Sequence, residues 1–136
     1  MAGSFKKNYK YLFILLFIFL SNIGFSQQPK LMLPIGHTGA INTAVFSNDG
    51  KKVITISGLD NAKIWDVASG KLLADLVGHT GNFESALFSP DDKKIVTASD
   101  DSTAIIWNAE TGKPIVTLYG HTHEVQSAIF SPDGKK

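Results

Sequence analysis

Gly36-His37-Thr38-Gly39 opens a stretch that returns 42 residues later as Gly78-His79-Thr80-Gly81, and Gly120-His121-Thr122 opens a third copy. Residues 36–77 and 78–119 align without a gap and share 18 identities in 42 positions. A fixed period of this length marks an array of copies of one supersecondary unit. Such units bury their apolar faces by stacking on one another, so the array offers surface rather than a deep catalytic cleft.

Four short runs in each copy carry β-branched and aromatic residues, and turn-forming residues separate them. In the first copy the runs are Ile41–Ser47, Lys52–Ser57, Ala62–Trp65 and Leu72–Val77. In the second copy they are Phe83–Ser89, Lys94–Ser99, Ala104–Trp107 and Pro114–Tyr119. We therefore expect an all-β fold in which each copy forms a four-stranded antiparallel meander. A further strand is expected at 124–131, without a partner.

Three signatures recur in register, namely Gly36-His37, Phe46-Ser47-Asn48-Asp49-Gly50 and Trp65-Asp66 with their copies. Together they resemble the WD-repeat (beta-transducin-like) family over residues 36–136. The resemblance implies a partial β-propeller with full blades at 36–77 and 78–119 and the start of a third blade at 120–136. Closed propellers have more blades than this, so we expect an N-terminal piece of a longer protein or a truncated reading frame. The alternative is self-association that completes a ring.

The first 26 residues differ in composition. Lys6, Lys7 and Lys10 precede an apolar run, Leu12–Leu20, and a short polar segment follows that ends at Gly24-Phe25-Ser26. This order predicts a signal peptide cleaved after Ser26 and an exported protein, whether periplasmic, cell-surface or extracellular. The alternative is a retained membrane anchor, but the run is short for a bilayer span.

Residues 27–35 lie where the last strand of a preceding blade would fall. In the WD-repeat family an N-terminal strand often closes the ring, and Leu31, Met32, Leu33 and Ile35 could form it. The alternative is a plain linker, because the run is short and contains Pro34.

Composition excludes several classes of protein. The chain has no arginine, and residues 27–136 carry ten lysines against twelve carboxylates, a net charge of −2. No basic footprint of a nucleic-acid-binding protein is present. The chain also has no cysteine, which excludes disulfides, a thiol nucleophile and a lipid-bearing cysteine. We predict no cofactor.

The resemblance assigns a structural network to residues that could be mistaken for a catalytic triad. In WD repeats a Gly-His histidine, a hydroxyl, an Asp and the Trp form hydrogen bonds inside one blade. By position these are His79, Thr97, Asp101 and Trp107, and in the first copy His37, Thr55 and Trp65. Neither an exposed nucleophile nor an oxyanion hole is signalled, so we expect no catalytic residues here.

The first copy departs from this pattern. Asp101 lies six residues before Trp107, whereas the residue six before Trp65 is Leu59, and Asp60 lies five before it. Either the turn is rearranged by one residue or this network lacks its carboxylate. A second possible site, the pair His121 and His123, has no third ligand at a suitable spacing, so we predict no metal site.

Residues that bind a partner are sought where the copies differ, because the shared positions serve the fold. Loops carried by a rigid scaffold are where binding residues collect. The candidate rim comprises Asn82, Glu84, Glu124 and Gln126. The sequence thus predicts an exported, non-catalytic scaffold for protein–protein interaction. Two alternatives stay open: the repeat region of a larger peptidase-like or kinase-like enzyme with its catalytic domain beyond Lys136, and a non-functional gene fragment.

Overall fold

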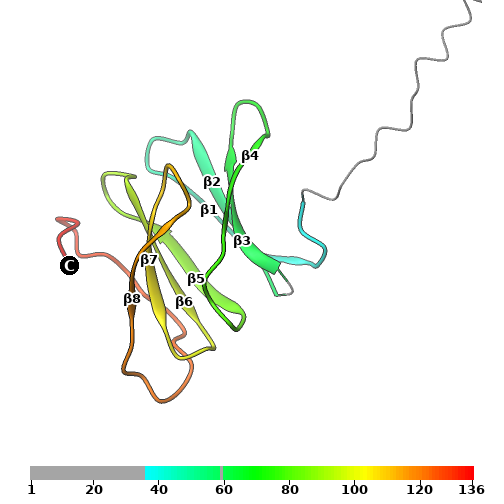
Figure 1. Ribbon diagram of the computed structural model, residues 1–136. Helices are drawn as coiled ribbons and strands as arrows, with labels where there is room; N and C mark the ends of the chain where they lie inside the picture. Colours follow the sequence, from blue (N-terminus) through cyan, green and yellow to red (C-terminus); the bar gives the residue numbers. More distant parts are fainter. Residues whose placement is uncertain (1–35, 59) are drawn as a thin grey trace, which may run out of the picture. The chain divides into compact units, whose positions relative to one another are not determined.

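The computed structural model describes residues 36–58 and 60–136 (Figure 1). The expected signal peptide, the residues 27–35 and Leu59 lie outside the described residues. The described part is all-β, and it contains no helix that could cross a membrane. Its eight strands are β1 Ile41–Phe46, β2 Lys52–Ser57, β3 Asp60–Asp66, β4 Leu72–Leu76, β5 Phe83–Phe88, β6 Lys94–Ser99, β7 Ala104–Asn108 and β8 Pro114–Leu118.

The strands form two antiparallel meanders, β1-β2-β3-β4 and β5-β6-β7-β8, and each strand pairs with its neighbours in sequence. We call them blade 1 and blade 2. The expected all-β fold with two four-stranded blades is therefore confirmed. Glycines with positive φ sit in the tight turns at Gly50, Gly70 and Gly112, a conformation that costs glycine little.

The two blades share one apolar core. Ile54, Ile56 and Leu76 of blade 1 pack in the same cluster as Ile95 and Trp107 of blade 2. Trp107 is consequently fully buried. The equivalent Trp65 is only partly buried, because none of the described residues covers the matching face of blade 1. Burial of each blade thus depends on the blade beside it, as expected of a stacked repeat.

The turns of neighbouring blades are also joined by polar contacts. The carboxylate of Asp92 accepts hydrogen bonds from the backbone N–H of Asn48 at 2.8 Å and of Asp49 at 2.9 Å. The side-chain amide of Asn48 also donates to Asp92, at 2.8 Å. Asp92 has a φ of 57°, whereas glycine fills the same position in the other two copies, at Gly50 and Gly134. An aspartate in this conformation is uncommon, and here it supplies the acceptor that holds the two turns together.

The third copy contains no strand among its residues 120–136, so the expected strand at 124–131 is not formed. A ladder requires a pairing partner, and no described residue pairs with this segment. It is held instead by a hydrogen bond from the Val125 N–H to the Ser99 carbonyl, 2.9 Å. The turn at 131–134 also lies beside Pro90, since a Cβ added at Gly134 would meet the proline ring at 3.5 Å.

Candidate functional site

The histidine network of blade 2 joins the Gly-His loop to two strands. The Trp107 indole N–H donates to the Thr97 hydroxyl at 2.8 Å, and that hydroxyl lies 2.8 Å from His79 Nε2. His79 Nδ1 lies 2.9 Å from the Asp101 carboxylate. Because the Asp101 carboxylate can only accept, the proton of a neutral imidazole lies on Nδ1, and Nε2 accepts from Thr97. The structure thus brings together the four residues that the sequence singled out.

Thr103 is a further member of this network that sequence reasoning missed. Its hydroxyl donates to Asp101 Oδ1 at 2.6 Å and lies 3.1 Å from His79 Nδ1. The Thr80 N–H also donates to Asp101, at 2.9 Å. Burial alone would raise the pKa of Asp101, but the hydrogen bonds from Thr103, Thr80 and His79 outweigh it and hold that pKa well below its usual range. The signal available in the sequence was a threonine two residues after the aspartate, which suits a local side-chain-to-backbone turn.

Blade 1 has the same network up to its carboxylate. Trp65 donates to Thr55 at 2.7 Å, and Thr55 lies 2.7 Å from His37 Nε2. His37 Nδ1, however, is 3.6 Å from Asp60 and makes no hydrogen bond within the described part of the chain. The network therefore contains a nearby carboxylate that does not bond the ring.

The cause of this difference is the turn before β3. In blade 1, Ser57 pairs directly with Asp60, whereas in blade 2 the last pair is Ala98 with Ala104, which leaves a longer turn. Asp60 accepts instead from the Thr38 N–H, the Thr38 hydroxyl and the Gly39 N–H, at 2.5, 2.8 and 3.3 Å. These bonds from Thr38 lower the pKa of Asp60. The turn before β3 thus differs from that of blade 2, and no carboxylate among the described residues is bonded to the histidine of the blade 1 network.

The network residues are poorly placed for catalysis. The Thr97 hydroxyl, 2.8 Å from His79 Nε2, is fully buried, and the Thr103 hydroxyl, 3.1 Å from Nδ1, is already bonded to Asp101. A nucleophile must reach its substrate, and the Thr97 hydroxyl cannot. Within residues 36–58 and 60–136, no group of three or more possible metal ligands gathers, around His121 and His123 or elsewhere.

The four candidate rim residues are all exposed. Asn82 donates to Asp100 at 3.0 Å, and Gln126 donates to Glu124 at 3.2 Å. Glu84 lies at a register shift between Phe83 and Ser85 in the β5–β6 pairing. Such an irregularity changes the direction of a side chain relative to the regular pleat, and Glu84 is exposed there.

A polar hollow of about 370 Å³ lies between the two blades, and the rim residue Asn82 lines it. Blade 1 contributes Asp60, Asn61 and Lys63, and the Gly-His loop of blade 2 contributes residues 79–83, which include Asn82. Lys63 is held by Asp75 in an ion pair of 2.5 Å. The hollow could not be found from the sequence, because its two walls come from different copies of the repeat.

Comparison with known proteins bears on the whole array. The family model described as "WD domain, G-beta repeat" matches residues 28–66, 70–108 and 112–136. No curated protein matches the chain. Each matched segment begins eight residues before a Gly-His pair, so the sequence repeat is offset from the sheet that forms one blade. Repeats of this family typically mediate protein–protein interaction and are generally non-catalytic. The matches cover most of the chain, and the protein therefore belongs to the WD-repeat family, with a propeller module for protein interaction.

Proposed function

We propose that this protein is an exported, non-catalytic scaffold that binds a protein partner at the candidate rim of Asn82, Glu84, Glu124 and Gln126. The observation that supports the proposal is the contrast between the buried residues of the blade network and the exposed residues that vary between copies. The shared residues Thr97 and Trp107 are buried and hydrogen-bonded to each other inside blade 2. The rim residues differ between copies and are exposed, and one of them, Asn82, lines the polar hollow. Exposed side chains that the fold does not require are available to bind a partner.

Site-specific photo-cross-linking in cells tests this binding role. A cross-linking residue at Glu84 is expected to give one discrete protein adduct, which Asn82→Ala or Gln126→Ala reduces. The control position is Ala68, an exposed residue in the turn between β3 and β4 at the opposite end of the strands. The same adducts from both positions, or none from Glu84, would contradict a specific rim.

Export is tested separately, by the mass of the protein recovered outside the cytoplasm. The proposal expects Gln27 as the N-terminal residue. Recovery of an intact Met1–Ser26 segment in the membrane fraction would show an anchor instead, and in that case the protein would contact the membrane through this segment. Self-association to complete a ring is a further proposed interaction, and it would appear as a concentration-dependent mass in solution.

A further inference from the structure

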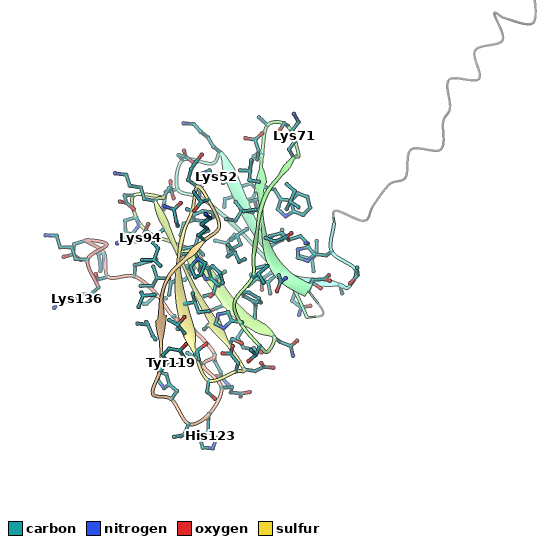
Figure 2. All side chains as sticks on the ribbon, in the orientation of Figure 1. Lys52, Lys71, Lys94, Tyr119, His123 and Lys136 are labelled. Atoms are coloured by element: carbon teal, nitrogen blue, oxygen red, sulfur yellow. The ribbon has the colours of Figure 1, made fainter. Side chains whose placement is uncertain are left out.

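Positive charge in the described residues is gathered at one end of the strands. Eight of their nine lysines lie in or beside the turns β1–β2, β3–β4, β5–β6 and β7–β8 and the matching turn of the third copy. Figure 2 labels four of these lysines, and Tyr119 and His123 appear at the far end of the molecule from Lys52 and Lys71. We call this set the lysine rim: Lys51, Lys52, Lys71, Lys93, Lys94, Lys113, Lys135 and Lys136.

Five of the six carboxylates at the same end accept hydrogen bonds from backbone N–H groups, and the sixth, Glu110, pairs with Lys52 at 2.6 Å. Each copy has a Ser-x-Asp turn in which the Asp accepts from the Ser hydroxyl and from a backbone N–H, as Asp91 does from Ser89 at 2.6 Å and from the Lys93 N–H at 3.1 Å. Asp92 is bound between the blades. Most of the lysine side chains, in contrast, are long and exposed, and the amine groups of Lys71, Lys93 and Lys113 make no ion pair with any described residue. At this end of the strands, the lysine amines therefore reach further into solvent than most of the carboxylates do.

The opposite end of the strands is acidic. It holds six carboxylates, and the remaining lysine, Lys63, lies within β3 and is paired with Asp75. Counting these charges gives −5 there, against +2 for eight lysines and six carboxylates at the lysine rim. A strand of five or six residues separates the ends by roughly 17–20 Å, about twice the screening length of about 8 Å at physiological salt. The electrostatic interaction of a charged surface with the lysine rim is therefore set by the charge of that rim rather than by the net charge of the protein.

We propose that the lysine rim binds an anionic lipid surface by diffuse electrostatic attraction. The turns of this rim contain no arginine, so they lack the guanidinium group that binds a single phosphate through two hydrogen bonds. They also contain no aromatic side chain on which an unpaired base could stack. Lysine pairs repeat once per copy, at Lys51-Lys52, Lys93-Lys94 and Lys135-Lys136. Repetition along a rim suits a surface with charge spread over it. This contact is independent of the N-terminal segment, and it leaves the rim of the proposed protein partner facing away from the lipid.

Co-sedimentation of the full-length chain with vesicles tests the proposal. The measured quantity is the ratio of binding to phosphatidylcholine vesicles with and without phosphatidylserine. At about 1 kcal/mol per net charge, two charges give about a 30-fold contribution to this ratio. Lys71→Gln with Lys113→Gln brings the rim to neutrality, so the ratio is expected to fall about 30-fold. The N-terminal lysines contribute equally in every variant, so only the difference between variants is used.

Two matched variants sharpen the test. Lys71→Arg with Lys113→Arg keeps the charge and should keep the parent ratio. Glu84→Gln with Glu124→Gln removes two negative charges at the acidic end and should leave the ratio unchanged. An unchanged ratio in the Lys→Gln variant, or a rise in the Glu→Gln variant, would overturn the proposal.

Discussion

Replacing the Gly-His histidine should lower the free energy of unfolding more in blade 2 than in blade 1, although both histidines are almost completely buried. His79→Ala breaks the hydrogen bond with Thr97 and the charge-assisted bond with Asp101. His37→Ala breaks only the bond with Thr55, because Nδ1 of His37 has no partner among the described residues. A hydrogen bond to a charged group contributes about 1.5–3 kcal/mol, so we expect the two variants to differ by about that amount.

Urea denaturation followed by fluorescence measures this difference as a shift in midpoint at constant slope. Asp101→Ala provides the control background, since position 101 then has no side-chain acceptor for His79 Nδ1. There His79→Ala should cost about as much as His37→Ala does in the parent chain, within about 0.5 kcal/mol. Equal destabilisation by the two histidine variants in the parent chain would refute the assignment of the network. It would show that the shorter turn before Asp60 has no energetic consequence.

Three further predictions use pairs of equivalent positions. Gly78→Ala should lower the free energy of unfolding by about 1–3 kcal/mol, because its new Cβ would meet the Trp107 ring at 2.8 Å. Gly36→Ala, whose Cβ would have nothing within 4 Å, should change that free energy by less than about 0.5 kcal/mol. Equal changes in the two variants would contradict this packing. Asp92→Gly should lower thermal stability even though glycine gains up to about 1 kcal/mol in this conformation, since three accepted hydrogen bonds between the blades are lost, and a higher melting temperature would argue against the contact. The pKa of Asp101 is lowered in the folded state, so its contribution is present above the unfolded pKa of about 3.9 and is lost as pH falls below it; the acid limb of a pH–stability curve should therefore be flatter for Asp101→Asn than for the parent, and parallel limbs would count against the network.

The sequence by itself determined the repeat, the strand order and the identity of most network residues. This follows because a 42-residue period with turn residues at fixed positions leaves little freedom in where each strand begins and ends. Seven of the eight strands begin within one residue of the expected runs, and β3 begins two residues early, at Asp60. The network residues could be named because the WD-repeat resemblance assigns them roles, and its His, Thr and Trp recur in both full copies.

Only the tertiary structure decided how the copies differ. Whether Asp60 could replace the missing carboxylate depended on the length of one turn, and the answer was a distance of 3.6 Å to His37 that no pattern encodes. The bond of Asp92 to the neighbouring turn and the polar hollow beside Asn82 arise between blades, from residues more than 15 positions apart. Sequence patterns report which face of a strand is apolar. Contacts between stacked units depend on how the units are placed against one another, and that is settled only when their cores pack.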